Sequence, residues 1–339
     1  MTSVTRIDTV RLGQDGPRIG VQGFGAMGIS EFYGDTDEAA ARDTLDAALE
    51  AGVTLIDTAD IYGSGANEEF LAPFLAAHRD EVVLATKFAI ERRADDPTHR
   101  GIRNDPAYIR KAAEDSLRRL GIETIDLYYM HRRDPEVPLA ESVGAMAELV
   151  REGKVRHLGL SEVTGPELRE AHAVHPITAL QSEWSLFSRD VERSAVGAAA
   201  ELGVTFVPYS PLGRGFLTGA FADATKDLSG GDYRAYQPRF TGENAERNAA
   251  LLDPVRKIAA AHGATPAQIA LAWVHQRASV HGLTVVPIPG TRKRSRLLEN
   301  AAATRITLTA AELAELEPGG RGGGGRPPPP HRQPTARPP

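Results

Sequence analysis

Short apolar runs alternate with amphipathic stretches along most of the chain. Runs of aliphatic and β-branched residues with almost no charge are typical of parallel strands that are buried on both faces. Between successive runs, apolar residues recur at helical spacing, which predicts a helix after each strand. The predicted strands are residues 21–24, 54–57, 82–86, 125–129, 155–160, 178–181, 204–208 and 284–288. Strands and helices in this repeated order favour an α/β fold of the (β/α)8 TIM-barrel type over an open sheet.

Capping residues mark the ends of the predicted helices. Thr36 is expected to cap a helix that Gly52 ends. Asp105 is expected to cap a helix that begins at Pro106 and ends at Gly121. The other predicted helices are residues 67–78, 139–151, 165–173, 190–202, 246–262, 266–277 and 294–302.

Two segments depart from the repeat. Residues 8–12 and 18–21 are short runs joined by Gly, Asp and Pro, which predicts a hairpin across the floor of the barrel. Residues 210–245 contain many glycines and few periodic signals, which predicts a long loop after the seventh strand.

The composition is that of a folded protein with a different last segment. The 339 residues are 41% hydrophobic and 25% charged, which supports a sizeable core, and a βα barrel of this length is a single unit. We therefore predict one barrel domain over residues 1–318. Residues 319–339 contain only Gly, Arg, Pro, His, Gln, Thr and Ala, which predicts a disordered or polyproline-like tail.

Charge and residue usage exclude several classes of function. A net charge of −6 gives no support for a nucleic-acid partner. No apolar stretch is long enough to span a membrane and no signal peptide is visible, so we expect a cytoplasmic protein. The absence of cysteine excludes disulfides and thiolate metal sites, and the scattered histidines predict no metal site. The oligomeric state stays open.

Polar residues follow several of the predicted strands. Asp57, Lys87 and His131 stand at or just after the ends of three strands, and Tyr62 follows Asp57 by a short turn. In a βα barrel the carboxyl ends of all strands meet at one face, where active sites lie. These residues are therefore candidates for one shared pocket.

Eight phrases in the chain resemble the aldo-keto reductase superfamily, in that family's order and spacing, from about residue 5 to residue 316. The similarity is greatest to a bacterial and plant branch with a long loop after strand seven. The phrases are residues 23–34, 56–63, 85–87, 128–134, 158–162, 181–186, 208–217 and 287–293. The resemblance implies a (β/α)8 barrel that reduces the carbonyl group of an aldehyde or ketone, with NADPH/NADP+ as cofactor. The expected partner is therefore a small-molecule carbonyl substrate.

The resemblance implies that Asp57, Tyr62, Lys87 and His131 are the catalytic residues. A phenol has a pKa of about 10, so Tyr62 holds its proton at neutral pH and can deliver it to the developing alkoxide. The Lys87 ammonium would make that phenol a better acid, and the Asp57 carboxylate would hold the lysine charged. His131 would orient and polarise the carbonyl.

The resemblance also implies a cofactor site. Ser161 and Gln181 would bind the nicotinamide carboxamide, and Trp184 would stack on the nicotinamide ring. Lys293 and Arg296, where a helix begins after the eighth strand, suit a 2′-phosphate. The other predicted cofactor-binding residues are Gly25, Met27, Tyr209, Ser210, Leu212, Gly213, Gly215, Gly290, Thr291, Glu299 and Asn300.

Two other functions stay open at this point. Lys87 at a strand end is also the feature of a Schiff-base aldolase. A barrel that binds NADPH only to report redox state, with little turnover, is the second alternative. The substrate cannot be named from the sequence, although Phe32, Tyr33 and Phe88 follow the first and third strands and are candidates for an aromatic pocket.

Overall fold

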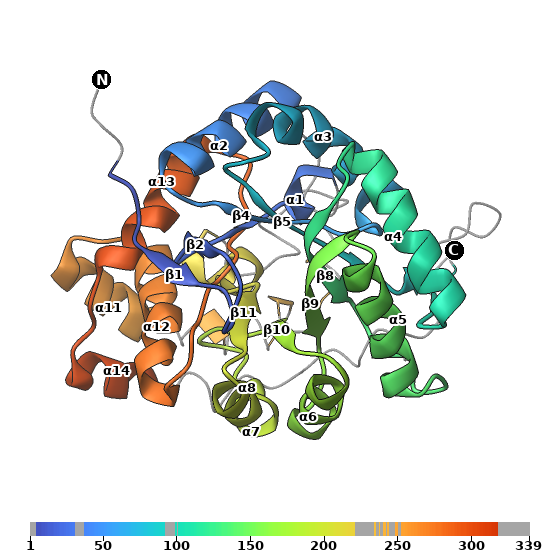
Figure 1. The fold of residues 1–339 in the computed structure, drawn as a ribbon. Coiled ribbons are helices and arrows are strands. Elements are labelled where there is room, and N and C mark those ends of the chain that lie inside the picture. Colours follow the sequence, from blue (N-terminus) through green and yellow to red (C-terminus); the bar gives the residue numbers. More distant parts are fainter. Residues whose placement is uncertain are drawn as a thin grey trace.

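A ring of helices surrounds a barrel of parallel strands (Figure 1). The computed structural model describes residues 5–30, 37–91, 99, 101–220, 234, 237, 240, 241, 243, 248, 249 and 252–317. Within these residues, seven strands form one sheet in the order β3-β4-β5-β8-β9-β10-β11, and each pair of neighbours is parallel. The strands are β3 (Phe24–Gly25), β4 (Leu55–Asp57), β5 (Val83–Phe88), β8 (Ile125–Met130), β9 (Val155–Ser161), β10 (Ile177–Glu183) and β11 (Thr205–Tyr209). The predicted barrel fold is confirmed.

The eighth predicted strand, residues 284–288, is not a regular strand, but it closes the barrel. Phe206 of β11 donates its N–H to Thr284 O at 2.8 Å, and Gly23 donates to Pro287 O at 2.9 Å. The segment therefore joins β11 to the chain before β3. Pro208 and Pro287 lack a backbone N–H, so a full ladder cannot form at this seam.

Side chains alternate between the barrel interior and the helix layer. Leu55, Ala85, Leu127 and Val207 lie in the same buried cluster inside the barrel. Their neighbours in each strand face outward and pack against the helices, because successive side chains of a strand point to opposite faces. This alternation decides which residues at the strand ends face the cavity.

The hairpin at the start of the chain covers the floor of the barrel, as predicted (Figure 1). Strand β1 (Thr9–Arg11) pairs antiparallel with β2 (Arg18–Gly20). Leu12 and Ile19 are fully buried in the interior cluster of the barrel. The hairpin therefore closes the end of the barrel that is opposite the carboxyl ends of the strands.

The helices follow the predicted order. Their bounds are α1 (Met27–Ser30), α2 (Glu38–Glu50), α3 (Ala66–His78), α4 (Pro106–Leu120), α5 (Leu139–Arg151), α6 (Gly165–Val174), α7 (Val191–Ser194), α8 (Val196–Leu202), α11 (Leu252–His262), α12 (Pro266–His281), α13 (Arg294–Ala302) and α14 (Ala310–Leu316). Short 3-10 turns are η1 (Tyr62–Gly65), η2 (Gly213–Thr218) and η5 (Ala303–Arg305), and β6 (Ile90–Glu91) pairs with β7 (Gly101–Ile102).

Two details of the predicted helices were wrong. The cap of α2 is Asp37, whose side chain accepts from the N–H groups of Ala39 and Ala40, and not Thr36. The predicted helix 190–202 breaks into α7 and α8 at Ala195, which has a φ of −138°. Val191 and Val196 are both buried. Residues five positions apart do not share one face of a continuous helix, so the break lets both side chains reach the core.

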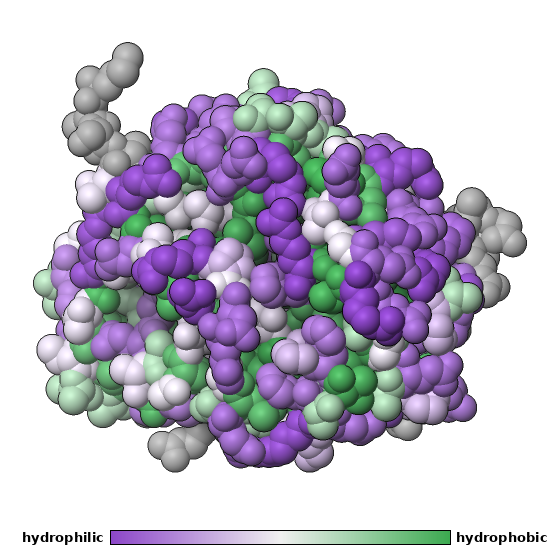
Figure 2. Space-filling view, in the orientation of Figure 1, coloured by the Kyte–Doolittle hydropathy of each residue, from purple (hydrophilic) through white to green (hydrophobic). Residues whose placement is uncertain are grey.

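The face of the molecule seen in Figure 2 is mainly hydrophilic, with apolar residues in small separate groups. Among the described residues, no helix is both long enough and apolar enough to cross a membrane. The predicted tail, 319–339, and most of the predicted loop 210–245 lie outside the described residues.

His275 of α12 gives the fold a testable pH dependence. Its Nε2 lies 3.3 Å from the side-chain oxygen of Gln22, and burial lowers its pKa to about 4. A histidine in the unfolded chain has a pKa of about 6.5. Between this pH and about 4 the unfolded state therefore binds a proton at His275 that the folded state does not bind. His275 therefore destabilises the fold as pH falls from about 6.5 towards 4.

We expect His275→Gln, which keeps a donor for Gln22, to reduce the loss of unfolding free energy between pH 7 and pH 5 by about 1–2 kcal/mol. Urea unfolding at both pH values measures this difference. An equal loss in the variant and the natural protein would show that His275 is accessible to protons in the folded state.

Candidate active site

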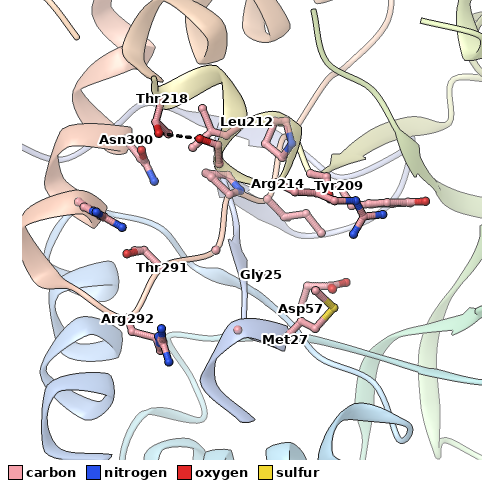
Figure 3. A pocket seen from close by; sticks show the side chains of 18 of the residues that line it. Gly25, Met27, Asp57, Tyr209, Leu212, Arg214, Thr218, Thr291, Arg292 and Asn300 are labelled. Carbon is pink, nitrogen blue, oxygen red and sulfur yellow. Dashed lines mark hydrogen bonds between the residues drawn. The ribbon is translucent and has the colours of Figure 1, made fainter. Parts of the chain in front are cut away.

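A cavity of about 830 Å³ lies where the strands end. Asp57 and Tyr209, the last residues of β4 and β11, are among the residues that line it. Figure 3 shows Asp57, Met27 and Tyr209 on one side of the space and Thr291, Arg292 and Asn300 on the other. The cavity therefore joins the predicted catalytic residues to the predicted phosphate-binding residues.

Asp57 and Lys87 form a buried ion pair in the wall of the cavity, which Asp57 lines. Lys87 Nζ lies 2.5 Å from Asp57 Oδ1 and 2.7 Å from the backbone oxygen of Thr58. Burial alone would lower the pKa of Lys87, but the Asp57 charge and hydrogen bond outweigh burial and raise it. Gln181 Nε2 donates to the other carboxylate oxygen at 2.8 Å. Lys87 is thus held as an ammonium with its position fixed.

Tyr62 lines the cavity beside this ion pair. It begins the turn η1, and its hydroxyl oxygen lies 3.4 Å from Lys87 Nζ. Burial raises the pKa of Tyr62, although the Lys87 charge acts in the opposite direction. The phenol therefore keeps its proton at neutral pH. The charge of Lys87 offsets only part of the effect of burial on the pKa of Tyr62. The lysine therefore makes this phenol a better acid to a smaller extent than expected from the sequence.

His131 follows β8, and its ring lies next to that of Tyr62. The two rings meet edge to face with their centroids 6.1 Å apart. Burial lowers the pKa of His131 well below its usual range, and the positive charges of Arg132 and Lys87 act in the same direction. The imidazole is therefore neutral at neutral pH, and it lines the cavity with only 8% of its surface exposed. A neutral ring can donate one N–H to a carbonyl oxygen.

The opposite end of the cavity is basic. Lys293 precedes the first turn of α13 and Arg296 lies within it, and both line the cavity. Neither side chain has an ion-pair partner among the described residues. Arg294, between them, instead lies 3.0 Å from Asp43 and also pairs with Glu50 of α2. The positive charge of Lys293 and Arg296 is therefore directed at the cavity, beside a helix start that itself favours anions.

Most of the predicted cofactor-binding residues are brought together. Those that line the cavity are Gly25, Met27, Gln181, Tyr209, Ser210, Leu212, Gly215, Gly290, Thr291, Lys293, Arg296, Glu299 and Asn300. Ser161 and Gly213 are buried beside it without lining it. Ser161 Oγ accepts from Arg132 at 3.3 Å.

Trp184 does not line the cavity, so its predicted stacking role is wrong. The indole is fully buried in the helix layer, packs against Phe206 with centroids 4.9 Å apart, and donates to Glu192 at 3.1 Å. The reason is that successive side chains point to opposite faces along β10 and into the residue that follows it. Gln181 faces the cavity, so Trp184, three positions further along, faces away from it. Tyr209 is an aromatic residue that does line the cavity.

The aromatic substrate pocket is not supported either. Phe88 is fully buried in the outer core, where its ring packs 5.0 Å from Tyr128. It follows Lys87 on β5, and neighbours on a strand point to opposite faces. Phe32 and Tyr33 lie outside the described residues.

Several lining residues were not predicted. They include three arginines and three isoleucines: Arg132, Arg214, Arg234, Ile61, Ile90 and Ile102. Arg132 had a signal in the sequence, because it directly follows His131 in a phrase already singled out. Arg234 had none, since it lies in an aperiodic segment; its Nη1 donates to the backbone oxygen of Arg214 at 2.9 Å.

The fold and this group of side chains place the chain among the barrel oxidoreductases that reduce carbonyl groups. It belongs to the aldo/keto reductase family, whose model matches residues 22–318. Nicotinamide cofactors are general in this family.

Solved structures agree along almost the whole chain. The glycerol dehydrogenase AKR11B4 from Gluconobacter oxydans is 30% identical, with a TM-score of 0.83 over 94% of this chain and 95% of that one. The holo form of the aldo-keto reductase AKR11C1 from Bacillus halodurans is 25% identical, with a TM-score of 0.73 over 93% and 97%. An aldo/keto reductase from Klebsiella pneumoniae in complex with NADP and acetate is 28% identical, with a TM-score of 0.70 over 92% and 95%.

Proposed function

We propose that the protein reduces aldehydes or ketones to alcohols with NADPH, and that Tyr62 is the proton donor. The observation that carries the proposal is the position of the Tyr62 hydroxyl. It lies 3.4 Å from the buried Lys87 ammonium and faces the same cavity as Lys293 and Arg296, which have no ion-pair partner among the described residues. Proton donor and anion-binding residues thus lie at two ends of one space, as transfer from a phosphorylated cofactor requires.

The residues of the cavity fit NADPH. Lys293, Arg296 and the hydroxyl of Thr291 are suited to a 2′-phosphate, because they offer two cations and a donor beside a helix start. The volume of about 830 Å³ is within the range of ligand pockets. Tyr209 would offer an aromatic face to the nicotinamide in place of Trp184.

The chain's own residues supply the remaining parts of the reaction. NADPH, when bound, supplies a hydride from nicotinamide C4 to the carbonyl carbon. His131, being neutral, donates a hydrogen bond to the carbonyl oxygen and holds it towards Tyr62. Tyr62 gives its proton to that oxygen, which completes the alcohol, and Lys87 stabilises the phenolate that remains. Asp57 keeps Lys87 charged throughout.

The test is a panel of aldehydes and ketones, with NADPH consumption and alcohol formation measured together. Turnover of about 1 s⁻¹ or more, with one alcohol formed for each NADPH, supports the reductase. Tight NADPH binding with no turnover on any carbonyl would favour the redox-reporting alternative. The aldolase alternative requires an accessible amine, whereas Lys87 is fully buried and bonded to Asp57. Borohydride trapping of a covalent adduct between a substrate and Lys87 would support the aldolase alternative.

The phosphate site makes a further prediction. We expect the double change Lys293→Ala and Arg296→Ala to weaken NADPH binding at least about tenfold, because charge-assisted contacts contribute about 1.5–3 kcal/mol each. NADH binding should stay nearly unchanged. Fluorescence titration with both cofactors measures the effect.

Arg294→Ala is the matched control, because this arginine lies on the same helix but pairs with Asp43 and Glu50. It should leave the preference for NADPH over NADH as it is. Equal weakening of both cofactors in the double variant would show that Lys293 and Arg296 do not recognise the 2′-phosphate.

A further inference from the structure

Arg132 lies at the catalytic end of the cavity, directly after His131. It is half-buried and lines the cavity together with Tyr62 and His131. Its Nη1 donates to the backbone oxygen of His131 at 2.7 Å and to Ser161 Oγ at 3.3 Å. These two bonds fix one edge of the guanidinium against the protein.

Arg132 forms no ion pair with a carboxylate in the described part of the chain. Its neighbours differ in this respect, since Arg133 lies 3.4 Å from Glu167 and Arg214 lies 3.6 Å from Glu183. The Nε and Nη2 atoms of Arg132 donate to no described group. A half-buried cation with free donors is a binding site for an anion.

The wall beside Tyr62 is otherwise largely apolar. Ile61 packs with Tyr62, Met27 and Ile90 in one cluster, and Ile102 also lines the cavity. A molecule bound at this end would place apolar carbon against these side chains. Any single anionic group that it carries would find its partner at Arg132.

We propose that Arg132 selects carbonyl substrates that carry a carboxylate on an apolar body. The inference rests on the proposed function, because that function places the reacting carbonyl between Tyr62 and His131. The Nε and Nη2 atoms form one edge of the guanidinium, and such an edge binds a carboxylate through two parallel hydrogen bonds. Arg132 is a specificity-determining residue in this proposal and takes no part in the proton transfer.

A competing explanation is that Arg132 only supports its surroundings. Through Ser161 it could hold the nicotinamide end of the cofactor site, and through His131 it could hold the imidazole. In either case its loss would affect every substrate equally. The two explanations are therefore separated by a pair of substrates of similar shape, of which one is an anion and the other is neutral.

The experiment compares 4-carboxybenzaldehyde with 4-nitrobenzaldehyde, which has a neutral group of similar planar shape. The nitro group withdraws electrons more strongly, but this difference is the same for every variant and cancels when the ratios of the variants are compared. The natural protein should have the lower KM for the carboxylate. Arg132→Met should lower the ratio of the two kcat/KM values, carboxylate over nitro, at least about tenfold, through the KM of the carboxylate. Arg132→Lys should restore part of that ratio, because it keeps a charge without the planar fork. Arg133→Met is the matched control, since this arginine lies outside the cavity lining, and it should not change the ratio.

Three results overturn the inference. An unchanged ratio in Arg132→Met, an equal loss for both aldehydes, or a natural protein that shows no preference for the carboxylate would each exclude selection by charge. Reduction of 4-nitrobenzaldehyde by the natural protein would leave the proposed function standing in all three cases. If the natural protein reduces neither aldehyde with NADPH nor any other carbonyl, the proposed function itself fails.

Discussion

Tyr62→Phe is expected to lower kcat for carbonyl reduction by about two to four orders of magnitude, which is the usual contribution of a positioned general acid. The change removes only the hydroxyl group that lies 3.4 Å from Lys87 Nζ. The ring stays available to pack with Ile61, and the basic end of the cavity is untouched. NADPH affinity should therefore change by less than about threefold. Steady-state assays and fluorescence titration of the cofactor measure the two quantities.

Tyr128→Phe is the matched control for this result. Tyr128 faces the helix layer, is fully buried, and its hydroxyl has no hydrogen-bond partner among the described residues. Its loss should leave kcat within about threefold and should not lower stability, because an unpaired buried hydroxyl contributes nothing that phenylalanine lacks. If Tyr62→Phe also stays within about threefold, Tyr62 is not the acid.

The barrel could be predicted because each of its parts has a local signal. Buried parallel strands are continuous apolar runs, and the helices between them carry their own caps, such as Asp105 before Pro106 and Gly121 after Leu120. The irregular backbone of residues 284–288, which close the barrel, could not be predicted from such a local signal. It depends on Pro208 and Pro287 standing on neighbouring segments, where Ile288 donates to Pro208 O and Gly23 donates to Pro287 O, and only the folded chain brings these segments together.

The candidate site was less predictable than the fold because strand ends face two ways. Asp57, Lys87 and His131 do face the barrel axis or the cavity, but Phe88 and Trp184 face the helices. The period of two along a strand would have excluded both aromatic residues once Lys87 and Gln181 were placed inside. Arg132 lies beyond the end of β8, where that period no longer applies. Its direction is set by its bonds to His131 and Ser161.

The Asp57–Lys87 pair should show strong coupling in a double-mutant cycle. Lys87→Met leaves a buried carboxyl with Gln181 as its one remaining hydrogen-bond donor among the described side chains, and Asp57→Asn leaves a buried ammonium without its counter-charge. Breaking a buried ion pair from one side costs about 3–5 kcal/mol of stability, whereas replacing both members removes the unpaired charge. We expect each single change to lower the unfolding free energy by about 3 kcal/mol. The double change should lose at least about 1 kcal/mol less than the sum of the singles. Urea unfolding at pH 7 measures all three.

Activity should behave differently from stability in the same cycle. Lys87→Met and the double variant both lack the ammonium that stabilises the Tyr62 phenolate, so both should lose at least about a hundredfold in kcat. The double variant would then be more stable than the sum of the single losses predicts, but no more active than Lys87→Met. This outcome would separate the electrostatic role of Lys87 in proton transfer from its role in holding the barrel together. If the double variant recovered activity along with stability, the pair would serve the fold alone. If the two single losses of stability were additive, the two charges would not act as a pair.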